Sequence, residues 1–167
     1  MTTRQNTTGE SADHGAAAVS RYLDATGVAY DLLEHRATYS AAEDARATGT
    51  APAEEAKVLL VRAANGYRMA VIPASDRLDL HKLRGLLDES GLRLATEQEM
   101  AADFPQFEVG AIPPFGPLLP ALEVLDRKLL ECDRIVCAGG DHRHSVKLDP
   151  REVVRVADPL VVDVCED

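Results

Sequence analysis

The sequence predicts an α+β protein with a single domain, in which helices pack on a mixed, mostly antiparallel sheet. Its 167 residues, 46% of them apolar, match the length of one ordinary domain with a sizeable core. Short apolar runs typical of strands alternate with segments of helical periodicity. No internal repeat or second boundary interrupts this pattern, which favours one layered α+β unit.

The N-terminal part predicts a tail, a helix, a strand and a second helix. Residues 1–14 are rich in Thr, Gly, Ser and Asn without apolar periodicity, so we expect a flexible tail ahead of a domain over residues 15–167. Apolar residues recur at helical spacing over 16–25, and Gly27 fits a left-handed C-cap. Residues 28–35 indicate a short strand, and the capping box of Ser40 and Glu43 starts the second helix.

A hairpin is the strongest local signal. Residues 51–56 predict a helical turn, and residues 57–63 a strand. Asn65-Gly66 then favours a two-residue turn, because both central positions of that turn type need positive φ, so strands 58–63 and 67–73 are expected to pair antiparallel. Further on, the sequence predicts a capped helix over 75–87, a strand over 92–95 and a capped helix over 96–102.

A proline-rich loop precedes the C-terminal elements. Residues 104–120 contain five of the nine prolines and all three phenylalanines. Such a stiffened loop inside a compact domain is usually functional. Beyond it we expect strands at 121–125, 134–138, 144–148 and 160–164, with helical pieces at 126–131 and 149–154.

Composition excludes several classes of function. With 18 Lys and Arg against 28 Asp and Glu, the net charge of −10 disfavours non-specific binding to DNA or anionic lipid. No apolar run approaches the ~20 residues of a bilayer span. The odd set of Cys132, Cys137 and Cys165 gives no disulfide framework, and the polar, acidic N-terminus is no secretory signal. We expect a cytoplasmic protein.

Several short motifs follow one another in a set order: His35, Thr38-Tyr39-Ser40, Lys57 before VLLV, Asn65-Gly66, AVIPAS, DRLDLHKL, LATEQE, GAIPPFG at 110–116 and AGGDHRHSVKLDP at 138–150. In this order they resemble the YbaK/prolyl-tRNA synthetase-associated domain family, which comprises free-standing and inserted aminoacyl-tRNA editing domains. The resemblance covers roughly residues 16–156. It implies a mixed α+β domain with an irregular, barrel-like sheet and hydrolysis of the ester that joins a wrong amino acid to tRNA.

The resemblance assigns three regions to the active site: the lysine that opens a strand, the glycine-proline loop, and the glycine-rich turn before a late strand. Some family members place an asparagine or a single histidine in that turn, so the resemblance does not decide whether His142 or His144 is the matching residue. The implied catalytic residues are Lys57, Gly110, Gly140, His142 and His144. The implied substrate-binding residues are His35, Tyr39, Ile112, Pro113, Pro114, Phe115, Gly116, Gly139, Asp141 and Ser145.

Ester hydrolysis needs a positioned water, a donor for the developing oxyanion and a selective pocket. No Ser-His-Asp or Cys-His order is visible, and the resemblance implies that a ribose hydroxyl of the terminal adenosine replaces a protein base. Lys57 would bind the terminal phosphate or the ester carbonyl, although an ordinary edge lysine is the plain alternative. Loop 110–116 would supply amides and a rigid wall with Phe115 closing the pocket, and Gly139-Gly140 would form an amide-lined turn.

The expected partners are the acceptor end of an aminoacyl-tRNA and an aminoacyl-tRNA synthetase that delivers it, because the acidic total leaves only local basic patches. Candidate tRNA-binding residues are Arg77, Lys82 and Arg84 around one helix, and Arg143 and Lys147 near the predicted site. A solvated helix face is the alternative for the first three.

The first hypothesis is a trans-acting deacylase that removes a mischarged small amino acid without a cofactor. The second is a non-catalytic module that binds a nucleotide, an amino-acid derivative or a partner protein, favoured if Phe115 or Tyr39 fills the pocket. The third is a metal-dependent hydrolase with His142, His144 and Asp141; Cys137 suggests zinc, but the tight Cys-x2-Cys pair of structural zinc is missing, so no metal is expected.

Overall fold

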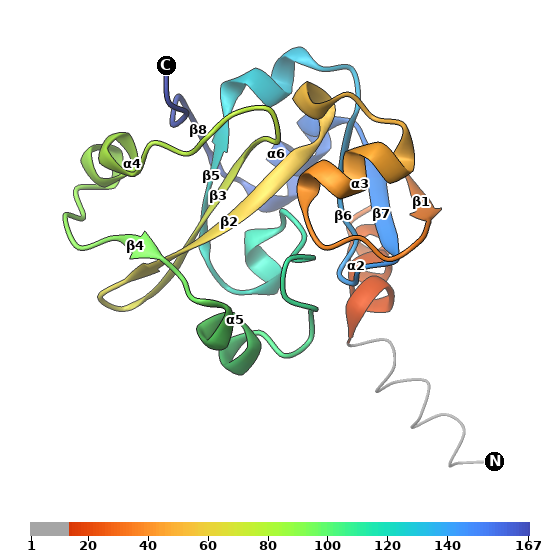
Figure 1. Ribbon diagram of the computed structural model, residues 1–167, viewed down its shortest axis with the longest axis horizontal. Helices are drawn as coiled ribbons and strands as arrows, with labels where there is room; N and C mark the ends of the chain where they lie inside the picture. Colours follow the sequence, from red (N-terminus) through yellow and green to blue (C-terminus); the bar gives the residue numbers. More distant parts are fainter. Residues whose placement is uncertain (1–13) are drawn as a thin grey trace.

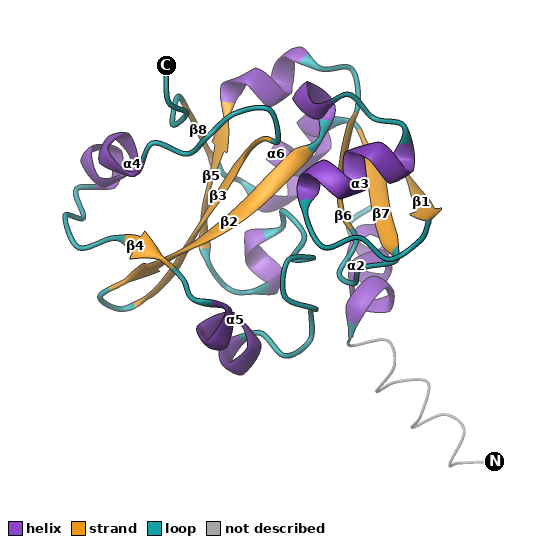
Figure 2. Cartoon of the chain, in the orientation of Figure 1, coloured by secondary structure: helices purple, strands orange, loops and turns teal. Residues whose placement is uncertain are grey.

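The computed structural model describes residues 14–167 and confirms the α+β class, with helices arranged around two β-sheets (Figures 1 and 2). The strands form two separately hydrogen-bonded sheets and do not close into one barrel. The predicted flexible tail lies, up to residue 13, outside the described residues. No helix within residues 14–167 is long and apolar enough to cross a bilayer.

The smaller sheet has the strand order β1-β7-β6 and is antiparallel throughout. It consists of β1 (Tyr30–Glu34), β6 (Ile135–Ala138) and β7 (His144–Leu148). Helix α2 (Gly15–Ala25) buries Val19 and Leu23 in the core. Helix α3 (Ala41–Thr48) begins at the predicted cap, where the Ser40 side chain accepts a hydrogen bond from the Glu43 N–H.

The larger sheet has the order β4-β2-β3-β5-β8. Its strands are β2 (Ala56–Ala63), β3 (Gly66–Pro73), β4 (Arg93–Leu94), β5 (Leu122–Asp126) and β8 (Leu160–Val162). The predicted antiparallel hairpin is confirmed, but Ala63 pairs with Gly66, so Ala64 and Asn65 form the turn. The predicted Asn65-Gly66 turn is wrong in this respect: positive φ occurs at Gly66, with 99°, and not at Asn65. Strand β5 pairs parallel with both β3 and β8, so the sheet is mixed.

The remaining helices cover the ends of the sheets. They are α4 (Leu80–Leu87), α5 (Glu97–Asp103) and α6 (Pro150–Ala157), with 3-10 turns η1 (Pro52–Glu54), η2 (Gly116–Leu118) and η3 (Arg127–Glu131). Helix α4 begins later than the predicted residue 75, because the Asp79 carboxylate, which accepts from the Lys82 N–H, is its actual cap. Thr96 and Glu99 form the complete capping box that starts α5.

The two sheets meet at one point, which we call the seam. An isolated parallel bridge joins Glu55, just before β2, to Val136 of β6. The main core cluster runs through both sheets and includes Phe115, Leu125 and Val146, while a second cluster around Leu83 lies against α4. The seam therefore brings the start of β2 next to β6 and close to α3.

Candidate active site

A cavity of about 230 Å3 opens at the seam. Its walls come from the start of α3, the first residues of β2, the loop after α5 and the turn between β6 and β7. It brings together these residues predicted from the sequence: Tyr39, Lys57, Gly110, Ile112, Asp141, His142 and His144. Asp44 and Glu55, which the sequence interpretation passed over, also line it.

Lys57 is held at the edge of this cavity. Its side chain is half-buried, and the ammonium donates a hydrogen bond to the backbone carbonyl of Asp76 at 3.0 Å. An ammonium carries three N–H donors, and this contact uses one of them. The charge is thus fixed in place by the turn after β3, whose Asp76 does not itself line the cavity.

The first half of the proline-rich loop forms the opposite wall. Gly110 has a φ of +87°, and a Cβ on it would lie 3.5 Å from the Tyr39 carbonyl oxygen, so a side chain here would be strained. Within residues 14–167, the N–H groups of Gly110 and Ile112 donate to no protein acceptor. These two amides can therefore donate to a ligand.

His142 lies in the turn between β6 and β7 and holds the loop in place. Its Nδ1 is 2.6 Å from the Glu108 carboxylate and its Nε2 is 2.7 Å from the Val109 carbonyl oxygen. The ring also packs against Tyr39, with centroids 4.6 Å apart. Both ring nitrogens therefore face oxygen atoms of the loop. The contacts leave neither nitrogen to act as a base, so His142 positions the loop.

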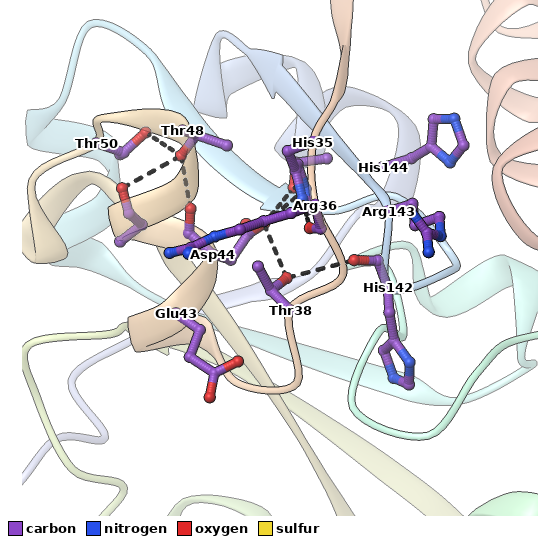
Figure 3. Close-up of polar contacts among 12 residues, drawn as sticks. His35, Arg36, Thr38, Glu43, Asp44, Thr48, Thr50, His142, Arg143 and His144 are labelled. Carbon is purple, nitrogen blue, oxygen red and sulfur yellow. Dashed lines mark hydrogen bonds and ion pairs between the residues drawn. The ribbon is translucent and has the colours of Figure 1, made fainter.

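His144 points elsewhere, as Figure 3 shows by the different directions of the two imidazole rings. Its Nδ1 lies 2.8 Å from the Asp141 carboxylate. His142 precedes β7 and sits in the turn, whereas His144 is the first residue of the strand. Within the described part of the chain, no group of three or more His, Cys, Asp or Glu side chains is placed to hold a metal ion.

The glycine pair at 139–140 serves packing. Gly139 N–H donates to the His144 carbonyl and Gly140 N–H donates to the Ala111 carbonyl, both at 3.0 Å. The predicted amide-lined turn is therefore wrong, because both amides are already used. A Cβ on Gly140 would lie 2.6 Å from the carbonyl carbon of Gly15, so the turn needs glycine to pack against α2.

The second half of the proline-rich loop leaves the cavity. Phe115 is fully buried and its ring packs 5.5 Å from that of Tyr22, because the large apolar side chain gains most in the core. The prediction that Phe115 closes the pocket is wrong. Gly116 donates its N–H to the buried Glu123 carboxyl at 2.6 Å. Three further predicted residues, Pro113, Pro114 and Gly116, are buried and do not line the cavity.

His35 and Ser145 form a buried polar cluster with Asp44. Figure 3 shows His35 and Asp44 side by side. The His35 Nε2 atom is 2.8 Å from Ser145 Oγ and 2.9 Å from Asp44 Oδ1. Ser145 Oγ donates to the same Asp44 oxygen at 2.5 Å. Neither His35 nor Ser145 lines the cavity, so their predicted contact with substrate is replaced by support of Asp44.

Glu55 stands beside Asp44 and is only 1% exposed. Burial first, and then the hydrogen bond and charge of Asp44, raise the pKa of Glu55 to about 11. A signal for Asp44 was present in the sequence, because it shares the inward helix face with Ala41, Ala45 and Thr48. Glu55 had no such signal, since its burial depends on the seam.

The predicted basic residues divide into two groups. Helix α4 lies at the opposite end of the molecule from α3 (Figure 1). Its Lys82 donates to the Cys165 carbonyl and pairs with Asp167, and Arg84 donates to the Leu92 carbonyl. Arg77, Lys82 and Arg84 therefore do not line the cavity, and their contact with tRNA stays a prediction. Arg143 and Lys147 are exposed on the turn and strand next to the cavity.

The two-sheet fold and its seam cavity define a class of protein, the aminoacyl-tRNA editing domains. The aminoacyl-tRNA editing domain family matches residues 35–156. The chain therefore belongs to this family, as the YbaK-like motifs implied.

Solved structures agree with this assignment. The hypothetical protein APE2540 is 31% identical with a TM-score of 0.81, over 89% of this chain and 99% of that one. A proposed trans-editing enzyme for prolyl-tRNA synthetase is 29% identical with a TM-score of 0.81, over 91% of this chain and 97% of that one. A comparison with curated proteins gave no match.

Proposed function

We propose that the protein is a trans-acting aminoacyl-tRNA deacylase that hydrolyses the ester of a mischarged small amino acid. The observation that carries the proposal is the seam cavity, whose lining includes Lys57, with its ammonium donors, and the loop residues Gly110 and Ile112, with their backbone N–H donors. These are the donors that a developing oxyanion needs. The free-standing relative described as acting in trans for prolyl-tRNA synthetase supports action on a released or delivered aminoacyl-tRNA.

The reaction requires water to add to the ester carbonyl carbon and the ribose oxygen to leave with a proton. Lys57 and the loop amides stabilise the negative charge that forms on the carbonyl oxygen. His142 uses both ring nitrogens to hold the loop, whereas His144 contacts the Asp141 carboxylate through Nδ1. The resemblance to the family implies that a ribose hydroxyl of the terminal adenosine activates the water.

The size of the cavity favours a small aminoacyl group. Its volume of about 230 Å3 lies below the ~300–1,000 Å3 range of pockets that enclose drug-sized ligands. The non-catalytic alternative was favoured if Phe115 or Tyr39 filled the pocket. Phe115 is in the core and Tyr39 is 66% exposed, so neither fills it.

The test is a panel of tRNAs mischarged with alanine, serine, cysteine or threonine, incubated with wild type, Lys57→Ala and Lys128→Ala. Lys128 is a matched control, because its ammonium pairs with the Asp76 side chain at 3.3 Å and thus contacts the same turn from outside the cavity. We expect release of at least one small amino acid by wild type and by Lys128→Ala. Loss of the Lys57 charge lowers the rate by about 100- to 1,000-fold, as removal of one oxyanion donor does elsewhere.

Two results would contradict the proposal. If wild type cleaves none of these esters, the protein is not a deacylase of small amino acids. If Lys57→Ala and Lys128→Ala retain equal, undiminished rates, Lys57 has no part in the reaction.

A further inference from the structure

Tyr39 presents an aromatic ring to solvent at the edge of the seam cavity. Its side chain is 66% exposed and lines the cavity, whereas every other Phe and Tyr within residues 14–167 is buried or half-buried. Aromatic side chains bury a large area in contacts and have flat faces that stack. The exposed ring is therefore a surface on which a planar ligand can lie.

The ring of Tyr39 is held in place although it is exposed. The backbone N–H of Tyr39 donates to the Glu43 carboxylate at 2.9 Å, and the ring packs against that of His142 with centroids 4.6 Å apart. His142 is in turn fixed by Glu108 and by the Val109 carbonyl. A side chain that is already positioned loses little conformational entropy when a ligand stacks on it.

Unpaired positive charge gathers on the same side of the molecule. Within residues 14–167, the lysine and arginine side chains with neither a hydrogen bond nor an ion pair are those of Arg36, Arg46, Arg77, Arg127, Arg143 and Lys147. All of these except Arg77 and Arg127 belong to the small sheet, to α3 or to the segments beside them. In a chain with a net charge of −10, such a local group of free cations indicates an anionic ligand.

Arg36 and Arg143 flank the cavity on two hydrogen-bonded segments. The N–H of His35 donates to the Arg143 carbonyl and the N–H of Thr38 donates to the His142 carbonyl, both at 2.9 Å. Thr38 and His142 line the cavity, so the two arginines lie just outside it, and both are exposed. Figure 3 shows their side chains pointing in different directions, so each can contact a separate anionic group.

The carboxylates around the cavity do not neutralise these two arginines. Glu43 accepts the Tyr39 N–H, Asp141 pairs with His144, and Glu108 pairs with His142. None of the three forms an ion pair with a guanidinium. The positive charge therefore remains available for a partner.

The size of the cavity leaves the nucleoside of an aminoacyl-tRNA outside. An aminoacyl group joined to adenosine is a molecule of drug size, and the cavity of about 230 Å3 is smaller than pockets that enclose such ligands. When the aminoacyl group is inside, the terminal base and the phosphates before it must lie on the surface around the opening. That surface includes the Tyr39 ring and the two arginines.

We propose that Arg36, Tyr39 and Arg143, here called the rim, bind the single-stranded 3′ end of the RNA, an inference that rests on the deacylase function proposed above for the identity of that RNA. The terminal base stacks on Tyr39, and the guanidinium groups pair with phosphates. Stacking is tolerant of base identity, and guanidinium binds phosphate through paired hydrogen bonds. The rim thus holds the end that all tRNAs share, while the cavity receives the amino acid.

The test is the binding of a fluorescently labelled, single-stranded RNA that ends in CCA-3′, measured by anisotropy from low to moderate salt concentration. This RNA carries no amino acid, so the measurement does not depend on hydrolysis. We expect Tyr39→Ala to weaken binding about 5- to 150-fold, as loss of one base–aromatic stack does, and Tyr39→Phe to retain it. An RNA without its terminal base should bind wild type equally weakly, and in Tyr39→Ala the loss of that base should have no further effect.

The arginines are tested by the salt dependence of binding. Arg36→Gln and Arg143→Gln should each reduce the slope of log K against log salt concentration by about 0.7, the value for one phosphate contact on a single strand. Arg127→Gln is the matched control, because Arg127 is also exposed and unpaired but lies in η3, outside the cavity lining. It should keep the wild-type slope. Thermal unfolding confirms that these surface variants are folded.

The outcomes separate the two proposals. The rim is overturned if wild type does not bind the RNA at low salt, if Tyr39→Ala binds as tightly as wild type, or if removal of the terminal base weakens binding equally in both. An equal loss of slope in Arg127→Gln also overturns it, since the effect is then one of total charge. None of these results affects ester cleavage in the tRNA panel. Conversely, binding through the rim without cleavage of any ester leaves the rim intact and removes the deacylase.

Discussion

Glu123 makes the stability of the protein depend on pH. The residue is 4% exposed, and its carboxyl accepts the Gly116 N–H at 2.6 Å. Burial raises the pKa of Glu123 from 4.5 to about 8, although the Gly116 hydrogen bond opposes the shift. In this range the folded protein keeps a proton that the unfolded chain has lost.

The sign and size of the effect follow from proton linkage. Because the folded pKa is raised, the stabilising contribution is complete below about pH 4.5 and is lost as the pH rises to about 8. Because one proton is bound only in the folded state, the free energy of unfolding falls by about 1.4 kcal/mol for each unit by which the pH rises between these two values. Glu123→Gln removes this titration, and the Gln carbonyl can still accept from Gly116.

The assay is urea unfolding of wild type and Glu123→Gln at several pH values between about 5 and 8. We expect the stability of the variant relative to wild type to rise steadily across this window. Glu131→Gln, which changes an exposed glutamate, should follow the wild-type curve. Parallel curves for wild type and Glu123→Gln would refute the argument that the buried carboxyl is protonated in the folded state.

Two further substitutions test the packing of the glycine turn and the loop. Gly140→Ala should destabilise the fold by about 1–3 kcal/mol, because φ is +99° and the new Cβ would meet Gly15. Gly85→Ala is the control, since its Cβ would meet nothing within 4 Å, and it should not destabilise the fold. Equal melting temperatures for the two variants would contradict this. Phe115→Ala should lower the free energy of unfolding in urea by about 3–5 kcal/mol and leave KM for the cleaved ester unchanged. If the variant is as stable as wild type but its KM is altered, Phe115 lies in the cavity.

Local signals made much of the fold predictable. Asn65-Gly66 indicated the β2–β3 hairpin, although its turn lies one residue earlier. Ser40 and Thr96 indicated the starts of α3 and α5, because turns and caps depend on neighbouring residues. The division of the strands into two sheets was not predictable in this way. It depends on the bridge between Glu55 and Val136, which are far apart in the sequence.

The candidate site was predicted in part for a similar reason. Lys57, Gly110 and His142 came from the family resemblance and line one cavity. The roles of the proline-rich loop and of the Gly139-Gly140 amides were misjudged, since only tertiary structure decides whether a phenylalanine faces a pocket or the core. Asp44 and Glu55 were missed because acidic residues are normally taken as solvated.

The seam has a consequence for how selectivity can change. Within residues 14–167, the two sheets are joined by a single β-bridge, between Glu55 and Val136. Substitutions on either side of the seam can therefore widen or narrow the cavity, or change its charge, without breaking the pairing of any strand. Such an architecture permits one scaffold to acquire different amino-acid preferences through a few local replacements.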